Sequence, residues 1–348
     1  MHISCVAAAT QDCTRKSEGD AIALADGRLF LAYMEFFGNG HDDACTRIVA
    51  VESTDGGFSW SAPRVLAIPQ EGDLNVYSPN LLRATDGGIL LIYMRQHTQV
   101  PRCSTLVAMV SHDEGATFAL LAEFMPRTTH SLCNGTLKRL ASGRLLLPTC
   151  CDAPAPKSGQ YEAALVYSDD DGLTWCESPE RIRLPMRGVM EPHVEETVEG
   201  RVMMVMRSQL GAIFLSESAD DGVTWSLPQT TGLRSPESCP EMSRHPVTGD
   251  LLLIWNDAPY NPGHASHYGR RTPLRAARSS DGGKTWVRVG DIENDPARAF
   301  SNPGCRFIDS GHAVVNYWTC EYLPNGSMQS VIDLRVAMIP AEWFLQNG

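Results

Sequence analysis

Short apolar runs, each preceded by a turn that ends in glycine, recur six times along the 348 residues of this chain. The runs are residues 29–33, 89–93, 145–148, 202–206, 251–255 and 313–317, and the turn glycines are Gly27, Gly87, Gly143, Gly200, Gly249 and Gly311. Runs of this length that are bounded by turn residues indicate β-strands. The pattern therefore predicts six repeated units built around strands.

A second pattern repeats in phase with the first. The octet Ser-x-Asp-x-Gly-x-Thr/Ser-Trp/Phe occurs five times, at intervals of 50 to 61 residues. The octets are residues 53–60, 111–118, 168–175, 218–225 and 279–286. In such a turn the aspartate bonds to the backbone, the glycine takes the left-handed conformation and the aromatic ring packs between neighbouring sheets.

A repeat period near fifty residues is typical of propeller blades. We therefore predict an all-β fold, a six-bladed β-propeller of four-stranded antiparallel blades, as a single domain over residues 1–348. The sixth unit lacks its octet, and its last strand is expected to pair with the N-terminal strand. That pairing would close the ring and leave no free sheet edge.

Composition narrows the classes of partner. No apolar run approaches the roughly 20 residues that span a bilayer, and the net charge of −12 argues against nucleic acid or an anionic membrane surface as partner. The N-terminus lacks a basic segment followed by an apolar one, so we expect no signal peptide. Eleven cysteines without a Cys-x-x-Cys spacing predict mostly reduced, buried thiols in a cytoplasmic protein.

The octets are Asp boxes, and with the Gly-Arg-Leu-Leu strand at 143–146 the chain resembles the sialidase (neuraminidase) superfamily over essentially its whole length. Asp boxes lie on the outer rim of the blades, so they imply a fold and not an activity. Function is expected in the funnel around the central axis, where the innermost strands meet. Counting nine residues back from each turn glycine selects one equivalent position per blade: Glu18, Ser78, Asn134, Glu191, Pro240 and Asn302.

The resemblance is most specific in the fourth unit, where Arg207 follows Glu191-Pro192 by 16 residues. In sialidases the corresponding glutamate acts as base toward a tyrosine nucleophile, and the arginine belongs to a triad that binds the substrate carboxylate. Arg271, eight residues before the fifth octet, corresponds to a second arginine of that triad. The family's acid/base aspartate lies in the loop before the first octet, where this chain has both Asp42 and Asp43.

Two positions depart from the family. The first sialidase arginine is replaced within Ser17-Glu18-Gly19-Asp20, and Arg15 lies two or three residues too early. The position of the tyrosine nucleophile holds Asn302, which cannot act in that way. A mechanism through a tyrosyl-sugar intermediate is therefore not expected.

We predict an exo-acting glycoside hydrolase that cleaves a terminal, acidic sugar. Asp42 or Asp43 would protonate the leaving oxygen, and Glu191 or Glu18 would act as base or nucleophile, because glycoside hydrolysis needs a pair of carboxyl groups. The predicted substrate-binding residues are Arg15, Arg207, Arg271, Asn75, Asn134, Asn302 and His193. Arginine suits this role because its fork matches a carboxylate.

We expect no cofactor and no bound metal. Three alternatives stay open: a lyase acting on uronate polysaccharides, a metal-assisted enzyme, and a carbohydrate-binding propeller without activity. For the metal-assisted enzyme the residues of ligand type are His41, His193, His264 and His267 with the two glutamates, although their spacing matches no recognisable ligand motif.

Overall fold

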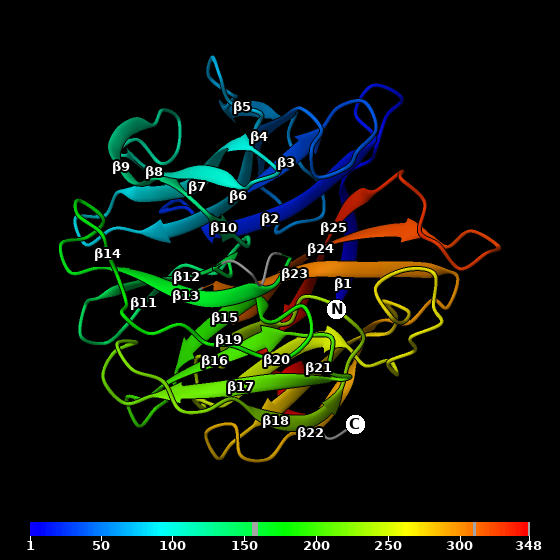
Figure 1. Cartoon of the computed structure of the whole chain (residues 1–348). Coiled ribbons are helices and arrows are strands. Elements are labelled where there is room, and N and C mark those ends of the chain that lie inside the picture. Colours follow the sequence, from blue (N-terminus) through cyan, green and yellow to red (C-terminus); the bar gives the residue numbers. More distant parts are fainter. Residues whose placement is uncertain (155–158, 309–310, 347–348) are drawn as a thin grey trace.

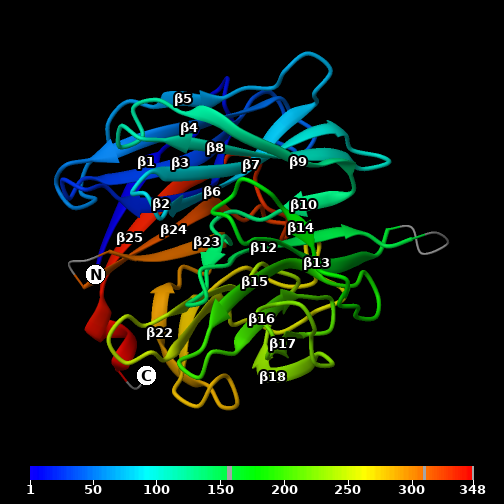
Figure 2. The ribbon, with the colours of Figure 1, turned by 90° about the vertical axis from the view of Figure 1, so that its left-hand side faces the viewer.

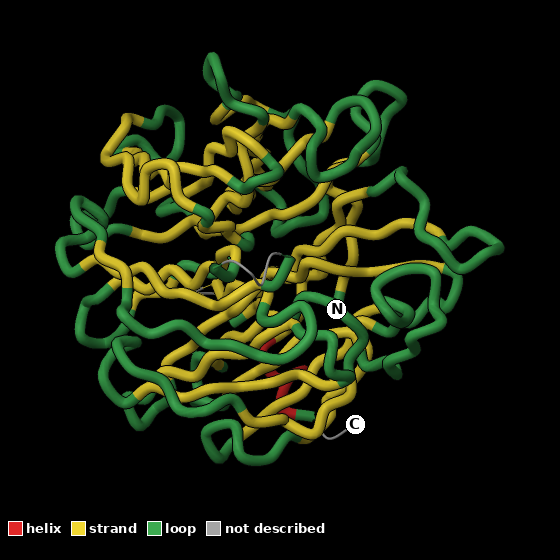
Figure 3. The backbone as a smooth tube through the Cα atoms, in the orientation of Figure 1, coloured by secondary structure: helices red, strands yellow, loops and turns green. Residues whose placement is uncertain are grey.

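The computed structural model describes residues 1–154, 159–308 and 311–346. Its strands form six antiparallel sheets arranged around a central axis, as Figures 1 and 2 show from two directions. Figure 3 shows that strands and loops make up nearly the whole chain. The predicted all-β, six-bladed propeller is confirmed.

Each blade begins with its innermost strand. Blade one contains β2 (Arg15–Ala23), β3 (Leu29–Phe36), β4 (Thr46–Ser53) and β5 (Arg64–Ala67). Blade two contains β6 (Asn75–Arg83), β7 (Ile89–Thr98), β8 (Cys103–Ser111) and β9 (Ala119–Thr128). Blade three contains β10 (His130–Leu132), β11 (Lys138–Arg139), β12 (Leu145–Asp152), β13 (Tyr161–Ser168) and β14 (Cys176–Glu177), with β10 and β11 both paired to β12.

The remaining blades follow the same order. Blade four contains β15 (Met190–Glu196), β16 (Val202–Arg207), β17 (Ala212–Ser218) and β18 (Gln229–Arg234). Blade five contains β19 (Glu241–Arg244), β20 (Leu251–Asn256), β21 (Leu274–Ser279) and β22 (Val287–Glu293). Blade six contains β23 (Arg298–Ile308), β24 (His312–Glu321) and β25 (Asp333–Pro340), and its outermost strand is β1 (His2–Ala7). Because β1 pairs with β25, the two ends of the chain close the ring as predicted.

The Asp boxes are self-contained turns. In the box of blade two, the hydroxyl of Ser111 donates to Asp113 Oδ1 at 2.8 Å and accepts from the backbone N–H of Gly115 at 2.8 Å. Asp113 also accepts hydrogen bonds from the backbone N–H and the hydroxyl of Thr117, at 2.8 and 2.6 Å. The other four boxes repeat this network. Each aspartate therefore shapes its own turn.

The aromatic residue of each box packs between its own blade and the preceding one. Trp175, for example, stacks on Phe124 with ring centroids 4.6 Å apart, in the core between blades two and three. Between blades five and six, where no box exists, the short 3-10 helix η1 (Ala341–Leu345) supplies Phe344, which is fully buried there. No helix among the described residues is long and apolar enough to cross a membrane.

A buried ion pair joins four blades close to the axis. Asp20 of β2 is fully buried and accepts two hydrogen bonds from Arg306 of β23, at 3.0 and 3.1 Å. The same carboxylate accepts from the backbone N–H of Leu81 in β6 at 2.7 Å, and Arg306 donates to the carbonyl of Leu137 in blade three at 3.1 Å. The pair fixes the positions of the innermost strands relative to one another.

The boxes predict a specific sensitivity to acid. Hydrogen bonds from Ser59 and Thr117, respectively, lower the pKa values of Asp55 and Asp113 to about 2. A lowered pKa in the folded state contributes stability that is present above the ordinary value near 4 and is lost as the pH falls toward about 2. We expect the melting temperature to fall over this window, and to fall less steeply in Asp113→Asn, which is already less stable at neutral pH.

Thermal unfolding followed by circular dichroism between pH 2 and 7 tests this expectation, with Asp12→Asn as the control at an exposed aspartate outside the boxes. A wild-type pH slope in Asp113→Asn would contradict the role given to the box.

Candidate functional site

The innermost strands surround a cavity of about 430 Å³, which is large enough for a monosaccharide. Among the described residues, five arginines and three carboxylates line it. The arginines are Arg15, Arg102, Arg187, Arg207 and Arg271, and the carboxylates are Glu18, Asp42 and Glu191. The lining thus carries an excess of positive charge within a chain whose net charge is −12. Such a cavity attracts anions.

Four innermost strands bulge at the same place. The ladders of β2, β6, β15 and β23 shift register around Glu18, Ser78, Glu191 and Asn302, whose φ angles are 49°, 53°, 44° and 49°. These are the positions selected by counting back from the turn glycines. A bulge with a left-handed residue redirects side chains and is held only where the surrounding structure imposes it. All four residues line the cavity.

One cluster of charges lies between blades one and two. The guanidinium of Arg15 packs over the ring of Phe36 and forms ion pairs with Glu18 and with Asp42, the latter at 2.8 Å. Tyr77, one residue before the bulge of β6, places its hydroxyl 3.2 Å from Asp42 Oδ1. The side chain of Asp42 is 68% exposed, so this carboxylate stands at the mouth of the cavity.

A second cluster lies between blades four and five. Arg207 donates to Glu191 at 2.6 Å and lies 3.5 Å from the buried carboxylate of Glu237. Glu237 also receives Arg187 at 2.9 Å, and its backbone carbonyl accepts from Arg271 at 3.1 Å. Glu237 therefore holds three arginines in place from behind. The Nε atoms of Arg207 and Arg271 are buried and have no hydrogen-bond partner within the described part of the chain.

The two clusters move the pKa values of their members in different directions. Burial raises the pKa of Glu18 more than the charge of Arg15 lowers it. Burial also acts on Glu191, but the charge of Arg207 outweighs it and the pKa of Glu191 is lowered. Neighbouring protein atoms partly desolvate the Asp42 carboxylate at the mouth, but the charge of Arg15 and the hydrogen bonds from Arg15 and the hydroxyl of Tyr77 outweigh this effect and lower the pKa of Asp42. Carboxyl groups with divergent pKa values are suited to different roles in acid–base chemistry.

Arg271 is an arginine whose charge is poorly compensated. Burial and the neighbouring charge of Arg207 lower the pKa of Arg271 to about 10. The charge of Arg271 and burial together lower the pKa of His267, another residue of the cavity lining, so this imidazole is neutral. An anion that binds beside Arg207 and Arg271 would relieve the repulsion between these two guanidinium groups.

The structure places the predicted site residues in two groups. Glu18, Asp42, Glu191, Arg15, Arg207, Arg271 and Asn302 line the cavity, whereas Asp43, Asn75, Asn134 and His193 do not belong to its lining. Asn302 accepts a hydrogen bond from Trp318 Nε1 at 3.0 Å and donates to Glu18 at 3.3 Å. Arg15 lies two or three residues before the position of the first sialidase arginine, but its side chain still reaches the cavity lining.

The residues outside the lining have other partners. The amide of Asn75 donates to the backbone carbonyl of Asp42 at 3.0 Å and so supports the loop at the cavity mouth. The amide of Asn134 donates to the carbonyl of Gly19 at 2.7 Å and joins two innermost strands. His193 is fully buried and lies with Cys133 and Cys239 in a group of metal-ligand type.

Sequence reasoning missed several charged and aromatic residues of the cavity and its support, namely Tyr77, Arg102, Arg187, Glu237 and Trp318, and it named His267 only as a residue of metal-ligand type. The signal for Tyr77 was available, since it precedes the counted position Ser78, and the bulge brings both residues into the lining. Met190 and Glu191 repeat this arrangement in blade four. Glu237 lies in an irregular segment with no repeated marker, so no counting rule reaches it.

Comparisons with known proteins agree with this architecture. The model of the BNR repeat-like domain matches residues 27–310 of the chain. The fold thus belongs to the sialidase-like class of BNR-repeat β-propellers. The chain is a member of the BNR repeat-like domain family.

Solved structures with the same fold include proteins with and without a known function. A protein of unknown function from Dyadobacter fermentans is 17% identical, with 97% of this chain and 99% of that chain covered and a TM-score of 0.74. The NanB sialidase of Streptococcus pneumoniae is 12% identical, with 96% and 70% covered and a TM-score of 0.74. The sialidase of Trypanosoma rangeli is 14% identical, with 96% and 57% covered and a TM-score of 0.70. No curated protein sequence matches. At these identities the likeness shows the fold alone.

Proposed function

We propose that this protein is an exo-acting glycoside hydrolase that removes a terminal acidic sugar. The observation that carries the proposal is that one monosaccharide-sized cavity holds ionisable carboxyl groups together with two buried arginines, whose Nε atoms have no partner among the described residues. Buried guanidinium groups without a full set of partners favour a bound carboxylate, because charge-assisted, bidentate hydrogen bonds satisfy them.

The carboxyl groups divide the chemistry between them. Glu191, whose pKa is lowered, is ionised at neutral pH and suits a base that activates water or a nucleophile that attacks the sugar. Asp42 stands at the mouth, where the leaving group of an exo-acting enzyme would depart. An anionic substrate that draws Arg15 away would raise the pKa of Asp42 and allow it to donate a proton.

A second candidate function is a lyase that acts on a uronate. It is favoured by His267, whose imidazole lies in the lining beside Arg271 and would become more basic when a bound carboxylate neutralises that guanidinium. In this reaction the imidazole removes the proton α to the arginine-bound carboxylate. The electron pair forms a carbon–carbon double bond as the bond to the leaving oxygen breaks, and Tyr77 or Asp42 protonates that oxygen.

A turnover screen separates these functions. Purified protein is incubated with aryl glycosides of sialic acid, uronic acids and neutral sugars, and with uronate oligosaccharides. Release of the aryl group without a new double bond supports the hydrolase. Ultraviolet absorption from an unsaturated uronate supports the lyase. Saturable sugar binding without turnover would overturn both and indicate a binding propeller.

A further inference from the structure

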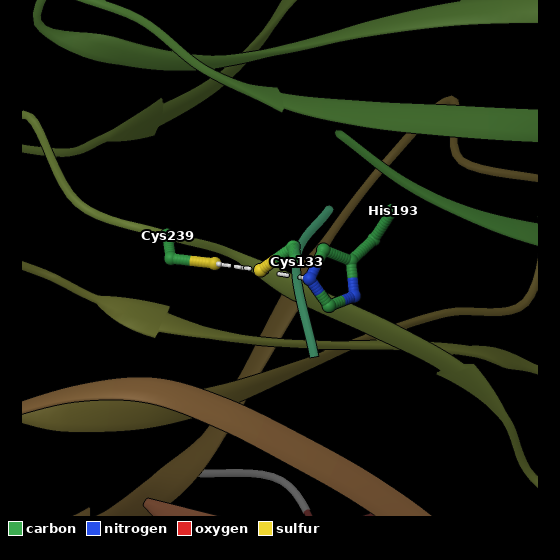
Figure 4. Close-up of side chains that lie close together, drawn as sticks. All are labelled: Cys133, His193 and Cys239. Atoms are coloured by element: carbon green, nitrogen blue, oxygen red, sulfur yellow. Dashed lines mark hydrogen bonds between the residues drawn. The ribbon is translucent and has the colours of Figure 1, made fainter. Parts of the chain in front are cut away.

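A group of metal-ligand side chains lies where the inner ends of blades three, four and five meet. Cys133 follows β10, His193 lies in β15 and Cys239 precedes β19. Figure 4 shows the two sulfur atoms and the imidazole directed toward one another. Their candidate ligand atoms all lie within 4.8 Å of one another, and the three side chains are buried. Cys133 and Cys239 hold equivalent places in their blades, each one residue before a counted position.

The spacing of the ligand atoms fits a tetrahedral zinc ion. Zinc–sulfur bonds of about 2.3 Å and zinc–nitrogen bonds of about 2.0–2.1 Å place two sulfurs about 3.8 Å apart, and a sulfur and a nitrogen about 3.6 Å apart. Here the sulfur atoms of Cys133 and Cys239 lie 3.5 Å apart, and Cys239 Sγ lies 3.7 Å from His193 Nε2. The third pair, Cys133 Sγ and the His193 nitrogen, lies within 4.8 Å, so these two groups would move closer by up to about 1.2 Å to seat the ion.

A buried carboxylate lies directly behind the imidazole of His193. Its Nδ1 atom lies 2.5 Å from a carboxylate oxygen of Glu241, and both side chains are completely buried. Neither Nδ1 of His193 nor either carboxylate oxygen of Glu241 makes a hydrogen bond within the described residues, so the two groups are in close contact without hydrogen-bond geometry. A carboxylate that binds one nitrogen of a histidine leaves the other nitrogen free for a metal, and this arrangement is usual around metal-bound histidines. A buried glutamate in this position has little value for packing alone.

We propose that Cys133 Sγ, Cys239 Sγ and His193 Nε2 bind a zinc ion, with Glu241 as the residue that positions His193. Thiolate and imidazole ligands together select zinc over the hard cations magnesium and calcium. The ion would link three neighbouring blades and lie beside the cavity, because Cys133 is also part of the cavity lining. The site stands independently of the proposed hydrolase activity.

Zinc binding to the full chain under reducing conditions tests the site. The protein is stripped with a chelator, titrated with zinc chloride against a chromophoric competitor, and its zinc content is measured by mass spectrometry. We expect one zinc ion per chain. Glu241→Gln should weaken binding about 10- to 100-fold, as loss of a metal-orienting partner does, and Cys133→Ser or Cys239→Ser should weaken it more. Cys150→Ser removes a buried cysteine of the same cavity and should leave affinity unchanged.

Cobalt in place of zinc gives a second readout that needs no variant. Wild-type protein should show thiolate-to-cobalt charge transfer and the intense visible bands of a tetrahedral site. Failure of the wild type to retain zinc would overturn the proposal, as would equal loss of affinity in Cys150→Ser and Cys133→Ser. A disulfide between Cys133 and Cys239 in the reduced, zinc-treated protein, detected by peptide mass mapping, would also overturn it.

Discussion

Replacement of Glu191 by glutamine is expected to lower turnover about 10²- to 10⁴-fold while the protein remains folded. Proton transfer by a positioned side chain contributes a factor of this size, and the amide cannot act as base or nucleophile. The substitution keeps the shape of the side chain. Arg207 retains its contact with Glu237, so no buried guanidinium loses its last partner. The measurement is kcat on the substrate found in the screen, with a thermal melt of the same preparation.

Glu199→Gln is the matched control, because Glu199 is an exposed glutamate in the turn after the same strand. It should retain wild-type turnover. Near-normal turnover in Glu191→Gln, in protein with a wild-type melting profile, would remove Glu191 from the chemistry. It would shift the assignment to Glu18, the other glutamate of the cavity lining.

The structure distinguishes the two aspartates that the sequence offered as proton donor. Asp42 lines the cavity, whereas Asp43 is exposed and does not belong to the lining. The sequence could not choose between them because both occupy one glycine-rich loop. The choice depends on the side chain of Arg15, which pairs with Asp42 across 27 residues of sequence. Long-range ion pairs of this kind leave no local pattern.

The fold could be predicted from the sequence because the turns and strands that define each blade are local and repeated. Every Asp box closes through hydrogen bonds within its own octet, so five copies identify five blades without any knowledge of distant contacts. The closure of the ring could also be predicted, because the last strand of the sixth unit needs a partner and the N-terminal strand is the one left over. The replacement of the missing aromatic residue by Phe344 could not be predicted, because a single phenylalanine near the C-terminus belongs to no repeated pattern.

Site residues could be predicted only where they occupy equivalent positions in the repeated blades. Glu18, Glu191 and Asn302 were found by counting, and the shared bulge explains why the count works. Glu237, Cys133 and Cys239 were missed, and His193 was named without these partners, because the residues come from irregular segments or from three different blades. Metal motifs are recognisable in a sequence when the ligands lie close along the chain, and here 106 residues separate the two cysteines.

Replacement of Arg271 by methionine is expected to raise KM for the acidic substrate about 30- to 1000-fold, with a smaller change in kcat. Loss of one partner from a buried, charge-assisted hydrogen bond costs about 2–4 kcal/mol, and binding of a carboxylate remote from the cleaved bond is nearly equal in the ground and transition states. The KM of Arg271→Lys should lie between those of the wild type and Arg271→Met, because lysine keeps the positive charge but lacks the planar fork of the guanidinium group.

The same variant distinguishes recognition from structural support. The lowered pKa of Arg271, about 10, means that its charged form is disfavoured in the folded protein, so removal of the charge should leave the melting temperature at neutral pH unchanged or higher. Against a substrate analogue whose carboxylate is replaced by a hydroxymethyl group, wild type and Arg271→Met should perform alike. If the variant loses the acidic and the neutral substrate to the same extent, Arg271 does not bind the carboxylate. The cavity's positive charge would then need another anionic occupant.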